Sequence, residues 1–271
     1  MVVADLHVHT TNSDGTLTLA EVPGAAREAG LEAVAITDHD RLHPRLDAPV
    51  ETRDGVTLVH GIELRVETDP QRVDLLGYGA RRTDALGAEI DRLQRDRRAR
   101  GRATVECVED RLGHSLPVEI ERGLGRPDVA RAVVASDPDY DEVGTVFDEL
   151  IDEDGPCYVP RAVPSFERGR ELLAEACEVV GLAHPLRYPD PEAALALAPT
   201  LDALEVHYPY DGARGYGKPT GAFDAADVER VAERHDLLVT GGSDAHGEIL
   251  GTTGLSASAF APVRDALEGA V

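Results

Sequence analysis

Three clusters rich in histidine and aspartate each follow a short apolar, β-prone run, and this pattern constrains the fold more than any other feature of the sequence. The clusters are Asp5–His9, Thr37–Asp40 and Gly242–His246, and the runs before them are Val2–Ala4, Ala33–Ile36 and Leu237–Thr240. If these runs are parallel strands of a barrel, all three clusters emerge at the same rim. Imidazoles and carboxylates from distant parts of the chain would then line one pocket suited to divalent metal ions.

Strand-like runs alternate with helical patterns along the chain, which predicts an α/β fold with about seven strands in a distorted barrel. A helix is expected after Thr18, whose spacing to Glu21 is that of a capping box. The other expected helices are Ser165–Cys177, Pro191–Leu197 and Asp224–His235. The expected strands are Val2–Leu6, Ala33–Thr37, Val56–His60, Val73–Gly77, a run near Tyr158, Val180–Ala183, Ala203–Val206 and Leu237–Thr240.

Residues 84–155 differ from the rest of the chain in composition and pattern. They are mostly charged, with helical patterns and few strand signals. We expect them to form a small helical insertion that caps the rim. The barrel would then consist of a first part, residues 1–83, and a second part, residues 156–271.

The charge balance is strongly acidic, with 51 acidic and 27 basic residues and a net charge of -24, and Lys218 is the only lysine. Self-repulsion of this size is relieved by salt screening, which indicates a high-salt cytoplasm and a halophilic microbe. The alternative is that the acidity excludes nucleic-acid substrates. An acidic surface need not describe the active site, so this alternative carries less weight.

The chain shows no sign of membrane association or export. No apolar run reaches the roughly 18 residues of a membrane span, and no basic segment leads into an apolar stretch at the N-terminus. The cysteines Cys107, Cys157 and Cys177 are scattered and odd in number. We therefore expect small buried thiols without disulfides and a cytoplasmic location.

The clusters contain more potential ligands than one ion needs. His7 and His9 lie two residues apart on an extended segment and share one face, a spacing that Asp244 and His246 repeat. Taken alone, Asp14 would be an ordinary turn residue and Glu63 a solvated acid at a strand end. Either Asp38 or Asp40 could orient a ligand imidazole. Eight candidates predict two or three ions: His7, His9, Asp14, His39, Glu63, His184, Asp244 and His246.

At this point the sequence resembles the PHP family, named for polymerase and histidinol phosphatase, over nearly its whole length. More narrowly, it is similar to PHP phosphoesterases that act on nucleotides and on short oligonucleotide 5′ ends. The matching motifs are Ser13-Asp14-Gly15, Ala35–Asp40, Gly61-Ile62-Glu63, Leu76-Gly77-Tyr78, Gly125-Arg126-Pro127, Tyr158–Arg161, Ala183-His184-Pro185 and Thr240–Gly247.

The resemblance implies a distorted (β/α)7 barrel of the PHP type with a trinuclear site. One metal would take His7, His9, Glu63 and Asp244, and a second Asp14, His39 and His246. The third would take Glu63, His184 and the residue after Arg126-Pro127, which is usually histidine in the family but is Asp128 here. The alternative for Asp128 is an acid in the first turn of a helix over Val129–Ala135. The expected ions are Mn²⁺, Zn²⁺ or Fe²⁺, with a harder ion such as Mn²⁺ or Mg²⁺ at the third site.

Basic residues supply candidates for substrate binding. Arg161 matches the family's arginine after Tyr-Val-Pro, and its guanidinium could bind a phosphate or form a structural ion pair. Arg126 and His207 are further candidates for contacts with the substrate. The arginines between residues 92 and 102 are either a solvated helix face or a positive lip that guides a phosphate-bearing substrate.

These features together predict a metal-dependent phosphoesterase in which Asp14, His39, Asp244 and His246 are catalytic. A metal-activated hydroxide would attack the phosphorus of a small phosphorylated substrate or of a short RNA or DNA 5′ end. A histidinol-phosphate-type phosphatase and a non-catalytic metal-binding or partner-binding module are alternatives. An amidohydrolase-like enzyme is disfavoured, since Lys218, the only candidate for a bridging lysine, lies in a loop rich in glycine and proline.

Overall fold

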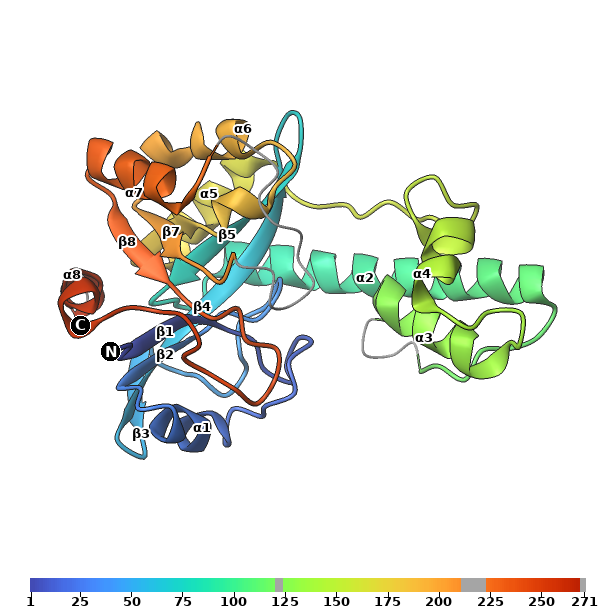
Figure 1. The fold of residues 1–271 in the computed structure, drawn as a ribbon, viewed down its shortest axis with the longest axis horizontal. Helices are drawn as coiled ribbons and strands as arrows, with labels where there is room; N and C mark the ends of the chain where they lie inside the picture. The colour runs from blue at the N-terminus through green and yellow to red at the C-terminus, as the bar shows by residue number, and fades with distance from the viewer. Residues whose placement is uncertain (120–123, 211–222, 269–271) are drawn as a thin grey trace. The chain divides into compact units, whose positions relative to one another are not determined.

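The computed structural model describes residues 1–119, 124–210 and 223–268 and divides into two compact units. Met1–Gly87 and Pro164–Val271 form one unit, here called the sheet unit, and Ala88–Val163 form the other, the helical unit (Figure 1). The expected insertion covered residues 84–155, so the helical unit begins four residues later and ends eight residues later.

The sheet unit contains one curled sheet. Its strands follow the order β1-β2-β4-β5-β6-β7-β8, and β3 pairs with β4 outside this path. The last and first strands approach each other, because Val8 and Ala245 form a parallel bridge. The expected distorted α/β barrel is therefore confirmed. The strands are β1 (Ala4–Val8), β2 (Ala33–Ile36), β3 (Val50–Arg53), β4 (Val56–Glu67), β5 (Arg72–Tyr78), β6 (Val179–Leu182), β7 (Ala203–His207) and β8 (Leu238–Gly241).

The sequence pattern suggested a parallel sheet, but the observed sheet is mixed. Strand β5 runs antiparallel to both β4 and β6. Only a short connection separates β4 from β5, and a parallel crossover needs a dozen or more residues, so a hairpin is the available geometry. As a result β4 is 12 residues long, and Glu63 lies inside it rather than at a strand end.

Helices cover the sheet on its outer side (Figure 1). Two of them begin at side-chain caps that are visible in the sequence: Ser165 accepts a hydrogen bond from the Arg168 amide, and Asp224 accepts one from the Asp227 amide. The core between the sheet and α8 includes Tyr78 and Val263, both fully buried. These helices are α1 (Val22–Glu28), α5 (Phe166–Ala176), α6 (Pro191–Leu195), α7 (Ala225–Arg234) and α8 (Ala257–Glu268).

The helical unit has its own apolar core. Helix α2 (Asp84–Leu112) enters it, followed by α3 (Arg126–Ser136) and α4 (Val143–Val146), which continues into the π-helical turn η2 (Phe147–Ile151). Fully buried side chains from three of these elements pack together, namely Val108, Val129, Val133 and Ile151. The strand expected near Tyr158 is wrong, because residues 158–164 form no strand.

The expectation that the cysteines stay unpaired is wrong for two of them. Cys107 on α2 and Cys157 form a disulfide, with their Cα atoms 5.5 Å apart and a sequence separation of 50 residues. Nothing in the local sequence signals a pair that depends on how α2 packs. Cys177 is free, and burial raises the pKa of its thiol to about 12. The cytoplasmic expectation, which rested in part on unpaired cysteines, loses that support.

None of the helices in the described ranges combines the length and apolar composition needed to cross a bilayer. Lys218, on which the argument against an amidohydrolase-like enzyme depended, lies outside the described residues.

Candidate metal centre

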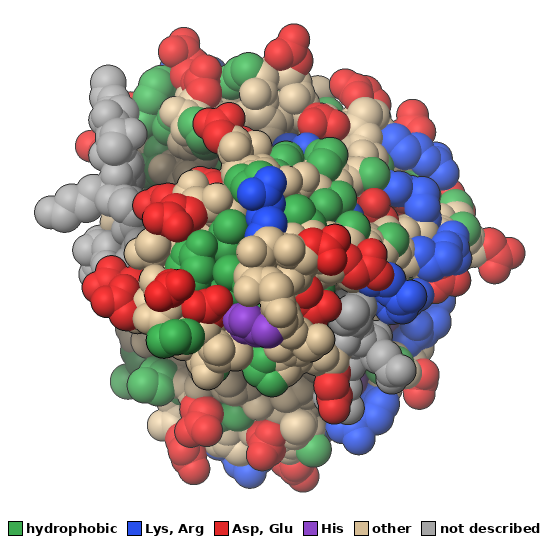
Figure 2. All heavy atoms as spheres, turned by 90° about the vertical axis from the view of Figure 1, so that its right-hand side faces the viewer, with side chains coloured by type: hydrophobic (Ala, Val, Ile, Leu, Met, Phe, Trp, Pro, Cys, Tyr) green, Lys and Arg blue, Asp and Glu red, His purple; other side chains and the backbone are tan. Residues whose placement is uncertain are grey.

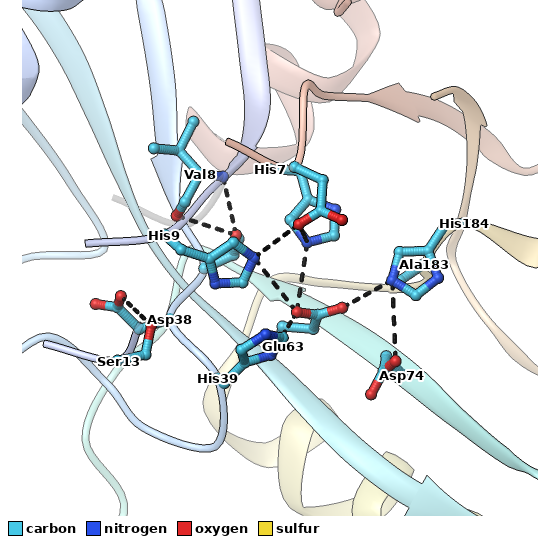
Figure 3. Close-up of polar contacts among 12 residues, drawn as sticks. His7, Val8, His9, Ser13, Asp38, His39, Glu63, Asp74, Ala183 and His184 are labelled. Atoms are coloured by element: carbon cyan, nitrogen blue, oxygen red, sulfur yellow. Dashed lines mark hydrogen bonds and ion pairs between the residues drawn. The ribbon is translucent and has the colours of Figure 1, made fainter. Parts of the chain in front are cut away.

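Glu63 is the central side chain of the candidate site. Four imidazoles surround its carboxylate in Figure 3, and they come from β1 and the residue that follows it, from the segment after β2 and from the segment after β6. Its Oε2 lies 2.7 Å from Nδ1 of His39, and its Oε1 lies 2.9 Å from Nε2 of His184. Because Glu63 is 1% exposed, its charge is compensated by groups of the site and not by water. The other two imidazoles are His7 and His9.

The first ligand group is fully enclosed and consists of His7, His9, Glu63 and Asp244. The Nε2 atoms of the two histidines lie 3.4–3.5 Å from Glu63 Oε2 and 3.1–3.6 Å from Asp244 Oδ1. Four ligands placed tetrahedrally at the usual metal distance are separated by about 3.4 Å. Both Nε2 atoms are buried without a hydrogen-bond partner. These unpaired donors and their spacing fit a divalent ion.

The second ligand group faces solvent. It brings Asp14, His39 and His246 together with His9, with ligand atoms all within 4.8 Å of one another. Asp14 Oδ2 lies 3.7 Å from His39 Nε2, and Asp14 Oδ1 lies 3.5 Å from His246 Nε2. The three side chains are 28–42% exposed, so a bound ion could keep positions for water or substrate.

The third group consists of Glu63, Asp74 and His184. Asp74 was not expected as a site residue. It lies on β5 between apolar neighbours and is 2% exposed. A buried acid inside an apolar strand is the signal that could have identified it. Both of its carboxylate oxygens accept hydrogen bonds from Arg65, at 2.6 and 2.5 Å.

The side chains of the site stabilise one another's charged forms against the effect of burial. Burial alone would lower the pKa of His7, but Glu205, Asp244 and Glu63 hold it well above its ordinary value. Burial would raise the pKa of Glu63, but His39 and His7 hold it well below. Burial lowers the pKa of His9 to about 4, with His39 adding to the effect. A neutral His9 has a lone pair available for a metal ion.

Groups around the ligands fix their orientation. Glu205, which the sequence analysis did not single out, accepts a hydrogen bond from His7 Nδ1 at 2.9 Å and one from the His184 amide at 2.7 Å. Asp38 accepts hydrogen bonds from Thr10, Asn12 and Ser13, so it holds the loop that carries Asp14. Gly242 allows the segment after β8 to approach His7, since a Cβ there would lie 2.4 Å from the His7 Cβ.

A second set of side chains anchors Asp244. Its Oδ2 accepts hydrogen bonds from the Tyr208 hydroxyl at 2.8 Å and from Arg187 Nη1 at 2.9 Å. Oδ1 is the oxygen that lies near His7 and His9. The two oxygens of this carboxylate are therefore divided between the ligand group and its support.

The remaining expected site residues do not belong to any of the three ligand groups. Their expected roles stay predictions. Asp128 lies in the first turn of α3, where it accepts hydrogen bonds from the Gly125 amide at 2.9 Å and from Arg131 at 2.5 Å. Arg126 stacks on the Tyr158 ring, 5.5 Å from its centroid. Arg161 is half-buried in the helical unit, and His207 is exposed at the end of β7.

Histidines and carboxylates from several strands of a distorted barrel form clusters suited to divalent metal ions. The chain also matches the model of the PHP domain over residues 5–150, more than half of its length. The protein therefore belongs to the PHP domain family, as the motifs indicated.

Named relatives span most of the chain. It is 28% identical to a 3′,5′-nucleoside bisphosphate phosphatase of Chromobacterium violaceum, over 91% of this chain and 88% of that protein. It is 29% identical to a phosphoribosyl 1,2-cyclic phosphate 1,2-diphosphodiesterase of Eggerthella lenta, over 91% and 95%. It is 26% identical to the 5′-3′ exoribonuclease Rnm of Escherichia coli, over 90% and 85%.

A solved structure agrees with this assignment. The chain superposes on a putative metal-dependent phosphoesterase of Bifidobacterium adolescentis with a TM-score of 0.73 and 25% identity, over 98% of this chain and 96% of the other. The expected enzyme class is confirmed: the protein is a metal-dependent hydrolase of phosphoric esters.

Proposed function

We propose that the protein hydrolyses phosphate esters of nucleotides, or the 5′ ends of short RNA or DNA, with at least two divalent ions in the sheet unit. The observation that supports this most directly is the contact between an enclosed ligand group and a solvent-facing one. The two groups share His9 and meet at Glu63. The names of a bisphosphate phosphatase and an exoribonuclease among the relatives support nucleotide substrates.

The role that we propose for each residue of the site follows from its exposure to solvent. Divalent ions bound there would acidify a water molecule and neutralise charge on the phosphate. His7, His9 and Glu63 are buried and orient the site without contacting substrate. Asp14, His39 and His246 are partly exposed and are placed to meet the substrate, with Asp244 at their side.

Phosphate binding is assigned to arginine. We assign the main contact to Arg161 on its motif, with Arg126 as a further candidate, because a guanidinium presents paired donors to phosphate oxygens. His207 is a further candidate for a contact with the substrate. We expect Mn²⁺, Zn²⁺ or Fe²⁺ as the ions, since imidazole and carboxylate ligands suit all three. A cytoplasmic location is part of the same proposal.

The test is a substrate panel in molar-range salt with added Mn²⁺. It contains 5′-phosphorylated oligonucleotides, nucleoside monophosphates, 3′,5′-bisphosphates and a ribose cyclic phosphate. The cyclic phosphate is included because a relative of similar identity is named a phosphodiesterase. Stepwise release of mononucleotides identifies an exonuclease, and inorganic phosphate from mononucleotides or bisphosphates identifies a phosphatase.

Two variants make the panel decisive. The double variant Asp14→Ala/His246→Ala should be inactive on every substrate. His235→Ala removes an exposed histidine from the end of α7 and should retain full activity. Failure of the wild-type protein to turn over any nucleotide or oligonucleotide would overturn the proposed substrate class.

A further inference from the structure

Asp74 and Arg65 form a matched pair across the β4–β5 hairpin, beside the third ligand group. They stand directly opposite each other in the antiparallel register. The guanidinium binds the carboxylate through two parallel hydrogen bonds, Nε to Oδ1 and Nη2 to Oδ2. Arg65 also follows Glu63 by two residues on β4, so both side chains project from the same face of the strand.

This pair changes what the third group can bind. Of its three members, Glu63 already contributes Oε2 to the first group, and Asp74 has both oxygens bound to Arg65. His184 Nε2 lies 2.9 Å from Glu63 Oε1 and 3.9 Å from Asp74 Oδ2. A divalent ion placed there would stand beside a positively charged guanidinium. The negative charge of Asp74, which could attract the ion, is already largely neutralised by Arg65, and both effects oppose binding.

Asp128, the ligand that the resemblance implies for a third ion, is also hydrogen-bonded, but by a single guanidinium nitrogen and at an exposed position. The Asp128 carboxylate accepts hydrogen bonds from Arg131 and from the Gly125 amide. Asp74 and Asp128, the two acids that do not also belong to the first group, are therefore both bound by arginine. The Nε2 atoms of His7 and His9, in contrast, are unpaired.

We propose that the Arg65 guanidinium, held by Asp74, takes the place of a third divalent ion, so that the protein binds two metals and one fixed cation. This inference rests on the proposed function, because it assumes that the first two groups bind metal. It differs from the trinuclear site that the PHP resemblance implies. Asp74, which holds the fixed cation, lies 3.9 Å from His184 Nε2, and a guanidinium cannot be removed by chelators.

The experiment counts bound metal. Chelator-stripped protein is titrated with Mn²⁺ and separately with Zn²⁺, freed of excess ion, and analysed by elemental mass spectrometry and calorimetry. We expect two equivalents in the wild-type protein. Arg65→Ser frees Asp74 and should raise the count to three. Arg72→Ser removes another arginine from the same hairpin, one paired with Glu67, and should leave the count at two.

A second variant covers the case that Arg65→Ser leaves an unpaired buried acid and does not fold. Arg65→Ser/Asp74→His replaces the pair with a neutral imidazole ligand, and it should also bind three equivalents. Three equivalents in the wild-type protein, or two in both folded variants, would overturn the inference and leave the proposed function intact. Fewer than two equivalents in the wild-type protein would instead overturn the multinuclear site itself.

Discussion

Glu205 on β7 accepts a hydrogen bond from Nδ1 of His7 on β1, at 2.9 Å across 198 residues of sequence. Both side chains are fully buried. This contact holds the His7 ring with Nε2 facing Glu63 and Asp244. With a metal ion on Nε2, it would keep the remaining ring proton on Nδ1.

Replacing Glu205 with glutamine should weaken metal binding without unfolding the protein. Loss of a carboxylate that orients a ligand histidine typically costs about 10–100-fold in metal affinity. We expect that loss in Glu205→Gln, measured by competition with a chelator of known affinity. Glu233→Gln, an exposed change on α7, is the control. Equal affinities in the two variants would show that Glu205 does not orient the ligand.

His60 makes folding stability depend on pH. It is 1% exposed, and burial, with Arg82 and His43, lowers its pKa to about 4. A histidine with a folded-state pKa below its unfolded value stabilises the fold fully above about pH 6.5, and this stability is lost as pH falls toward 4. Between pH 7.5 and 5.5 the wild-type protein should lose about 1 kcal/mol more than His60→Gln.

Chemical denaturation at constant high salt measures this difference for both proteins at each pH. Other titrating groups contribute equally to the two curves, so their difference isolates His60. Parallel stability curves for the two proteins would contradict a neutral buried His60.

An arginine stripe on α2 is expected to attract oligonucleotides. Arg95, Arg98 and Arg102 are exposed and spaced three and four residues apart, which places them on one side of the helix. Basic side chains also gather along the right-hand flank of the face in Figure 2. Replacing all three with alanine should raise KM several-fold for an oligonucleotide and little for a mononucleotide, because a longer substrate offers more phosphates.

The control removes three exposed arginines elsewhere, Arg168, Arg234 and Arg264, and so makes the same change in net charge. The effect of the stripe should shrink as salt rises. If KM for both substrates changes equally, the stripe does not select for chain length.

The disulfide between Cys107 and Cys157 should stabilise the helical unit. Closing a loop of this length removes unfolded-state entropy worth roughly 4 kcal/mol. Cys107→Ser/Cys157→Ser should therefore speed hydrogen exchange and proteolysis within residues 88–163 more than elsewhere. Cys177→Ser, which removes the free thiol, is the control. Unchanged protection of that unit would mean that the bond does not stabilise it.

The net charge of -24 should make stability depend on salt. At 0.1 M salt charges interact over about 10 Å, and at 1 M over about 3 Å. We expect the melting temperature to rise by several degrees between 0.1 and 2 M NaCl, with KCl giving the same rise. A melting temperature that is flat or falls with salt would refute the interpretation of the acidity as adaptation to high salt.

Much of the site could be predicted because its signals are local. The His7/His9 and Asp244/His246 spacings and the apolar runs before them place side chains on shared faces and at strand ends, and these depend only on neighbouring residues. The acidic composition, the helix caps at Ser165 and Asp224 and the PHP motifs are equally visible without a structure.

Tertiary structure alone decided the pairings between distant residues. Hairpin register places Arg65 opposite Asp74, sheet order brings Glu205 to His7, and helix packing joins Cys107 to Cys157. Glu63 was expected at a strand end. Because β4 continues through Glu63 to pair with the antiparallel strand β5, Glu63 lies inside β4. Such contacts depend on how whole elements pack, so no periodicity or short motif specifies them, and they decide which of the expected ligands remain available for metal.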